Sequence, residues 1–147
     1  VVIAIIGLLS TIAFISLNRA RAKARDAKRI SDVRELQSAL ELYYNDQTSP
    51  GYPQSNSAVV LSSTLLGTTY VASIPTAPTP AESNCIVTAV DYNPYTYKSY
   101  ASQTDNGVGY GWYRIQFCLG GASGGLTLGC IRAEPSGMSN VACAALP

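Results

Sequence analysis

The chain has 147 residues, with ten Lys and Arg against nine Asp and Glu and a net charge of +1. Charged residues make up 13% and apolar residues 47% of the sequence, which excludes a disordered polar tail. There is no His, which removes the most common general base, most nucleophile–base pairs and His metal sites. We expect a non-enzymatic protein that holds no cofactor or metal ion.

The charge is distributed unevenly along the chain. Residues 1–18 are uncharged, residues 19–29 carry a net charge of +5, and residues 30–147 carry a net charge of −4. The near-neutral average therefore combines three segments that lie in different surroundings.

The chain begins with an apolar stretch over residues 1–17, VVIAIIGLLSTIAFISL. A bilayer needs roughly 20 apolar residues, with about 17 as the lower limit. Because apolar residues occupy every face of this helix, a membrane anchor is favoured over a buried core helix or a cleaved secretory signal. We assign the following residues to the anchor: Val1, Val2, Ile3, Ile5, Ile6, Gly7, Leu8, Leu9, Ile12, Phe14, Ile15 and Leu17.

The next segment continues the helix without interruption. Residues 18–29 are rich in Ala, Arg and Lys, which are good helix formers, and no Gly or Pro occurs between Leu17 and Pro50. Apolar residues then recur at steps of three and four, which predicts a helix face that packs on a globular head: Ile30, Val33, Leu36, Leu40, Tyr43 and Tyr44. We predict one helix from Val1 to about Asn45, roughly 67 Å long. The spacing of Asp32 and Glu35 also fits a capping box that would start a second helix.

The remainder reads as turns and strands. A turn-rich cluster at residues 45–57 ends the helix, a short helix is an option over residues 58–66, and three prolines predict an extended loop over residues 73–84. Alternation predicts strands over residues 86–91, 95–100, 110–119 and 126–132, with GGASGG as a hairpin connection and a loop over 134–147. The predicted fold class is α+β, with a long N-terminal helical spine packed against a small antiparallel sheet of three or four strands.

Residues 1–53, from VVIAIIGLLS to YYNDQTSPGYP, resemble the N-terminal spine of type IV pilins and type II secretion pseudopilins. A weaker resemblance continues through Ile74-Pro75-Thr76 and the Tyr-rich strands. In that family the helix normally starts with an N-methylated Phe in a motif like FTLIELL, which we expect to precede Val1. The resemblance implies two parts: residues 1–29 form the anchor and filament-core helix with a basic flank, and residues 30–147 form the αβ head.

The resemblance also implies a function and partners. It predicts a structural subunit of a pilus-like surface filament, held in the inner membrane before assembly and then polymerised through its N-terminal helix for adhesion, twitching motility or DNA uptake. The implied partners are identical subunits, prepilin peptidase and the pilus assembly machinery. A pseudopilin that forms a periplasmic piston is the main alternative, and an anchored enzyme or a tip subunit are others.

Three interpretations are open for the basic flank. Its bases are Arg19, Arg21, Lys23, Arg25, Lys28 and Arg29. They suit a solvated, snorkelling flank at the membrane edge, salt bridges to acids of neighbouring subunits, or binding of DNA. DNA is the weakest of these, because the run contains no aromatic residue.

The four cysteines predict structural disulfides and an oxidising compartment, because the set is even and contains no CxxC motif: Cys85, Cys118, Cys130 and Cys143. Of the three pairings, we favour Cys85–Cys118 with Cys130–Cys143. A Cys118–Cys130 bridge across the GGASGG turn is the alternative. Asp91, Asn93 and Asp105 could suggest a calcium loop, but ordinary turn chemistry is the favoured explanation.

Overall fold

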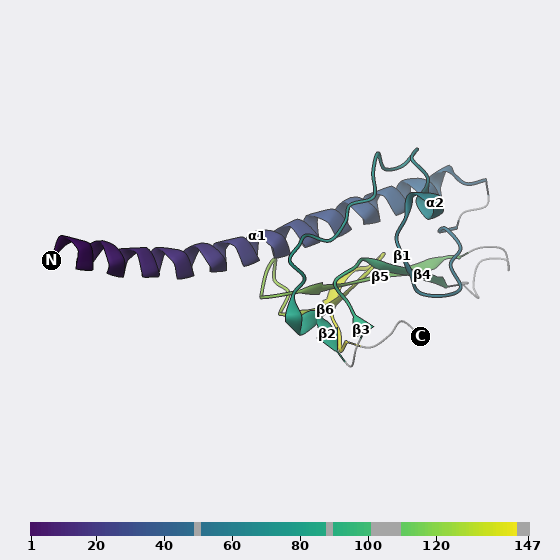
Figure 1. Cartoon of the computed structure of the whole chain (residues 1–147). Helices are drawn as coiled ribbons and strands as arrows, with labels where there is room; N and C mark the ends of the chain where they lie inside the picture. Colours follow the sequence, from purple (N-terminus) through teal and green to yellow (C-terminus); the bar gives the residue numbers. More distant parts are fainter. Residues whose placement is uncertain (49–50, 88–89, 101–109, 144–147) are drawn as a thin grey trace.

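A computed structural model describes residues 1–48, 51–87, 90–100 and 110–143. One α-helix, α1, runs without a break over Val2–Asp46. Its first half projects alone, and its second half lies across a β-sheet that forms the head (Figure 1). The predicted single helix is confirmed, and no second helix starts at Asp32, whose carboxylate binds Lys28 and Tyr95 instead of capping a helix.

The head contains a five-stranded antiparallel sheet in the order β1-β4-β5-β6-β7. The strands are β1 (Val59–Val60), β4 (Thr96–Tyr100), β5 (Trp112–Leu119), β6 (Gly129–Glu134) and β7 (Gly137–Asn140). Strands β2 (Ile86–Val87) and β3 (Val90–Asp91) pair separately as a second small sheet. Short helices complete the head: α2 (Ser63–Leu66) and the 3-10 helix η1 (Ser83–Cys85). The predicted α+β architecture is therefore confirmed.

Four details differ from the sequence-based expectations. The sheet has five strands where three or four were expected, because the short strands β1 and β7 add to its two edges. The segment 58–66 is only partly helical, because Val59–Val60 pairs with β4 before α2 begins. The segment 86–91 forms two short strands that pair with each other instead of one strand. The segment after residue 134 is not only loop, because Gly137 adopts a φ of 133° and turns the chain back to form β7 against β6. Only glycine reaches that backbone conformation readily.

The hydrophobic core lies between α1 and one face of the sheet. The predicted helix face is buried there at Ile30, Val33, Leu36 and Leu40, while Tyr43 and Tyr44 pack at its margin. The sheet contributes alternate residues of each strand, among them Tyr97, Tyr113, Ile115, Phe117 and Ile131. Several of the ten tyrosines are thus core residues whose rings pack on one another, such as Tyr52 and Tyr113 with centroids 4.6 Å apart.

The hairpin between β5 and β6 brings the chain back beside α1. Gly124 and Gly125 have φ values of 59° and 83°, and Ser123 and Leu126 exchange backbone hydrogen bonds across them. Positive φ at both central residues is the requirement of a type I′ turn. A Cβ on Gly124 would lie 3.0 Å from Ile30 Cδ1, so this turn closes directly onto the helix.

Candidate assembly surface and the helix–head junction

The first half of α1 presents apolar side chains on all sides. Every large apolar residue from Val1 to Leu17 is exposed, from 47% for Leu17 to 87% for Ile3 within the helix. The helix includes an 18-residue stretch with a mean hydropathy of 1.9, and none of that stretch is buried. The residues assigned to the anchor therefore lie on one continuous helix clear of the head. Such a surface is stable only where lipid or protein covers it.

The polar residues of this stretch have their hydroxyls satisfied inside the helix. Ser10 Oγ donates to the carbonyl of Ile6, and Thr11 Oγ1 donates to the carbonyl of Leu8, each at 2.8 Å. A hydroxyl bonded to its own helix does not need water, so both residues are compatible with an apolar environment. Gly7 has no atom within 4 Å of the position its Cβ would occupy, which leaves the backbone open to a close neighbour.

The last part of the basic flank, Arg25 and Arg29, forms ion pairs at the junction between α1 and the head. Arg29 is fully buried, and its Nη1 lies 3.2 Å from Asp26 Oδ1 and 3.8 Å from Glu82 Oε1. Arg25 Nη2 lies 2.9 Å from the same oxygen of Glu82. The solvated-flank interpretation is therefore wrong for Arg29 and does not describe Arg25. Arg19, Arg21, Lys23 and Lys28 are exposed.

Asp26, Arg29 and Glu82, with Arg25 and Asn93, form a buried junction that we call the helix–head clamp. Asn93 Oδ1 accepts hydrogen bonds from Arg29 Nη2 at 3.4 Å and from the backbone N–H of Glu82 at 2.8 Å. Asp26 Oδ1 also accepts the backbone N–H of Gly120 at 2.9 Å. One turn of α1 is thereby tied to the loop before η1 and to the end of β5. A buried charge pair with additional hydrogen bonds specifies geometry, because any displaced partner leaves an uncompensated charge.

A second polar contact lies about one turn further along α1. Tyr95 OH donates to Asp32 Oδ2 at 2.8 Å, and Lys28 Nζ lies 3.0 Å from Asp32 Oδ1. Burial raises the pKa of Tyr95 well above its usual range, and the hydrogen bond to Asp32 raises it further. The phenol therefore stays a donor at physiological pH. Sequence reasoning missed this contact and the clamp, although Asp26, Arg29 and Asp32 share the predicted buried face of the helix.

The disulfides are Cys85–Cys118 and Cys130–Cys143, and no described cysteine is free. The favoured pairing is confirmed. Cys118 and Cys130 lie directly opposite each other in β5 and β6, yet each bonds outside the hairpin. Together with Tyr92 the four residues form a second small core. Cys118 and Cys130 alternate with residues that face α1, so this core covers the opposite face of the sheet.

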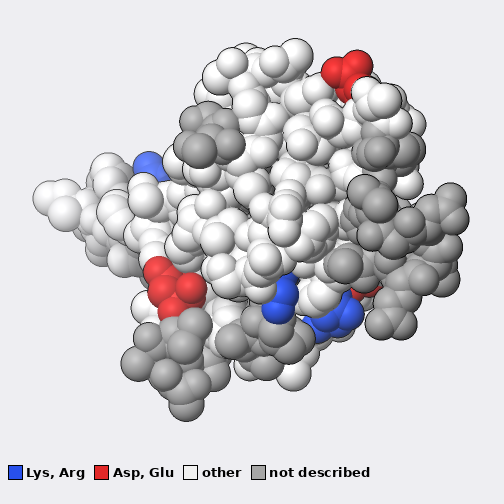
Figure 2. All heavy atoms as spheres, turned by 90° about the vertical axis from the view of Figure 1, so that its right-hand side faces the viewer, with Lys and Arg blue, Asp and Glu red and all other residues white. Residues whose placement is uncertain are grey.

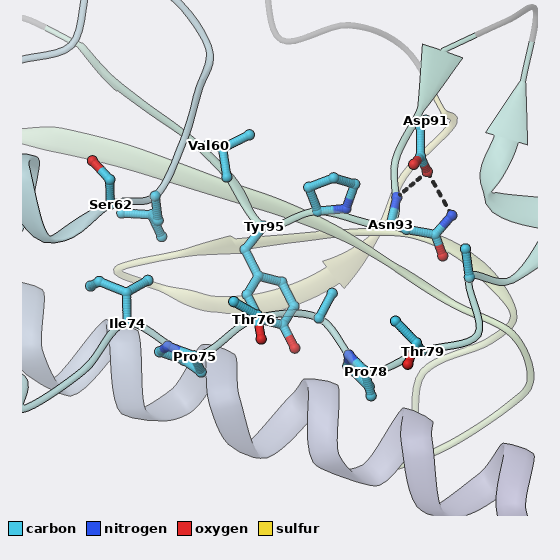
Figure 3. A pocket seen from close by; sticks show the side chains of 14 residues that line it. Val60, Ser62, Ile74, Pro75, Thr76, Pro78, Thr79, Asp91, Asn93 and Tyr95 are labelled. Carbon is cyan, nitrogen blue, oxygen red and sulfur yellow. Dashed lines mark hydrogen bonds between the residues drawn. The ribbon is translucent and has the colours of Figure 1, made fainter.

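A cavity of about 510 Å³ lies between β1 and the proline-rich loop that crosses α1. Figure 3 shows Ile74 and Pro75 on the loop side and Val60 on the strand side of this cavity. Asp91 accepts hydrogen bonds from the backbone and side-chain nitrogens of Asn93 at 2.9 and 2.6 Å, which is the turn interpretation of these residues. Asp105 lies outside the described residues. Among the residues that the structure describes, no cluster suits a metal ion.

Comparison of the chain with protein-family models, with curated protein sequences and with solved structures finds no match. The functional argument therefore depends on the surfaces and contacts of this chain.

Proposed function

We propose that the chain is a structural subunit of a type IV pilus-like surface filament that polymerises through the first half of α1. The observation that carries this proposal is the complete exposure of an apolar stretch on a helix that continues into the head. Lipid covers this stretch before assembly, and the same stretch of other subunits covers it afterwards. Burial is similar in both surroundings, so exchange between them does not expose apolar surface to water.

The junction and the disulfides support this proposal. The helix–head clamp keeps the head at one position along α1, so that each subunit would present its head in the same way along a filament. Two disulfides suit a head that lies in an oxidising compartment outside the cytoplasm. The apolar stretch then anchors the subunit in the inner membrane, with its head on the outer side.

A matched pair of substitutions tests the proposal in cells that express the chain. Leu9 on the apolar stretch is 61% exposed, and Leu128 on the head is 63% exposed. Leu9→Lys should lower the membrane-bound fraction and abolish sheared surface fibres, since a charge at mid-bilayer costs about 3 kcal/mol. Leu128→Lys should leave both unchanged. If the full chain is monodisperse in water without detergent, or if both variants behave alike, the proposal is wrong.

Fibre length separates this proposal from its alternative. Long fibres on the cell surface favour a pilus-like filament. Membrane-bound subunits that form no surface fibre at any expression level favour a short periplasmic pseudopilus.

A further inference from the structure

Two groups of charges on α1, one near its middle and one near its C-terminal end, form no ion pair with any described residue. Arg19, Arg21 and Lys23 are exposed, and they form no ion pair with any described residue. Glu41 and Asp46, near the C-terminal end of the helix, also form no ion pair with any described residue; Asp46 is exposed and Glu41 is partly buried. We call the first three the basic segment and the last two the acidic segment.

Among the described residues, no cation pairs with the acidic segment. Glu41 and Asp46 accept hydrogen bonds only from neutral phenols among the described residues, those of Tyr52 at 2.9 Å and Tyr70 at 2.8 Å. The last turn of α1 contains no basic residue, although the carbonyl end of a helix attracts cations. Figure 2 shows that the described atoms at the end of the head farthest from the N-terminus are mostly those of uncharged residues, with a few Lys or Arg and Asp or Glu side chains among them. The carboxylates of Glu41 and Asp46 are therefore free to pair with a cation of another molecule.

The two segments cannot neutralise each other within one copy. Their centres are separated by roughly 22 residues, or about 33 Å along a helix, which is about four Debye lengths at physiological salt. The remaining bases of the flank are already paired, because Arg25, Lys28 and Arg29 contact Glu82, Asp32 and Asp26. Among the described residues, no acid is left that pairs with the basic segment, so this segment is available to a partner outside the chain.

Each segment carries an exposed leucine one turn before a charge. Leu17 is 47% exposed and precedes Arg21 by four residues, and Leu42 is 59% exposed and precedes Asp46 by four residues. Residues four apart lie on the same face of a helix. The two patches therefore have the same order along α1, leucine and then charge, and their charges are opposite in sign. Parallel helices displaced by 25 residues, about 38 Å, align leucine with leucine and Arg21 with Asp46.

We propose that Leu17 and Arg21 of one copy bind Leu42 and Asp46 of a second, parallel copy, and that this contact sets an axial spacing in the polymer. The inference depends on the proposed function, because filament assembly supplies the parallel orientation. An antiparallel pair of helices could align the two leucines or Arg21 with Asp46, but not both at once, because the order of leucine and charge is reversed in one helix. The occupant of each patch is thus a second copy of this chain in a single register.

Charge reversal tests this contact in the full chain. Arg21→Glu and Asp46→Arg should each lower the yield of sheared fibres at least tenfold, and the double variant should recover to within threefold of the wild type. Arg34→Glu is the matched control, because Arg34 is exposed on the same helix and forms no ion pair with any described residue. Its fibre yield should match that of the wild type. Intact disulfides in each variant show that the head has folded.

A photo-crosslinking residue in place of Leu42 provides the second measurement. In wild-type fibres it should form adducts with residues near Leu17 of another copy, identified by peptide mapping. Adducts that map only to the head overturn the register, as does a double variant no better than either single one. A double variant that shows no recovery is the outcome expected if the basic segment binds anionic lipid. Absence of fibres from the unmodified chain would instead refute the proposed function.

Discussion

The buried guanidinium of Arg29 leads to the sharpest test of the helix–head clamp. Arg29→Met keeps the length of the side chain and removes its charge. In this variant Asp26, which is 2% exposed, would keep its hydrogen bond from the backbone N–H of Gly120. It would lose its ion pair with Arg29, the only ion pair of Asp26 among the described residues. Glu82 would keep Arg25 at 2.9 Å. Removal of one partner of a buried pair costs about 3–5 kcal/mol, so the free energy of unfolding should fall by that amount.

Thermal unfolding of the detergent-solubilised full chain, followed by near-ultraviolet circular dichroism, measures this loss. At roughly 4 °C per kcal/mol for a domain of this size, the Tm should fall by about 12–20 °C. The matched control is Arg34→Met, because Arg34 is exposed on the same helix and has no ion pair among the described residues. Its Tm should change by less than about 2 °C, as expected for a surface substitution.

A double variant tests the physical cause of the loss. Asp26→Asn removes the carboxylate charge and keeps an oxygen that can accept the Gly120 N–H. Added to Arg29→Met, it should therefore restore about 1–3 kcal/mol, since the uncompensated buried charge is gone. An Arg29→Met variant within about 1 kcal/mol of Arg34→Met would refute the reasoning, because the pair would then contribute no more than a surface charge.

Three further predictions concern the head. In denaturant unfolding, replacing Cys85 and Cys118 by serine should lower the free energy of unfolding by about 4 kcal/mol, and replacing Cys130 and Cys143 by about 3 kcal/mol, because the bridges span 33 and 13 residues. Equal or reversed losses would contradict the loop-closure argument. Burial raises the pKa of four tyrosines, Tyr52, Tyr95, Tyr97 and Tyr113, above 10.0, so the stability of the head should be fully present below pH 10 and fall above it. The absorbance of these tyrosines at 295 nm should change only when the head unfolds. Titration of all ten tyrosines in the folded state near pH 10 would contradict this prediction. Gly124→Ala should destabilise the head by about 1 kcal/mol or more in chemical denaturation, because Gly124 has a positive φ and its added Cβ would lie 3.0 Å from Ile30. Gly7→Ala is the control and should not destabilise the head. Equal effects of the two substitutions would contradict this prediction.

Local patterns in the sequence predicted the elements that depend on neighbouring residues. The run without Gly or Pro and the spacing from Ile30 to Leu40 predicted α1 and its buried face, because helix periodicity is a local property. Alternation predicted β4, β5 and β6 for the same reason. Strand β7 was missed, since its residues form a strand by pairing with β6 and carry little pattern of their own.

Contacts between distant residues were decided by the tertiary structure. The sequence showed six bases in one run, but only the folded head shows that Arg25 and Arg29 bind Glu82 and Asp26, while Arg19, Arg21 and Lys23 have no partner among the described residues. Glu82 lies 57 residues from Arg25, and no local periodicity connects them. The composition of the first 17 residues determined by itself that this helix has no polar face. Only the tertiary structure decided that the helix projects beyond the head, where no part of the head covers its apolar side chains.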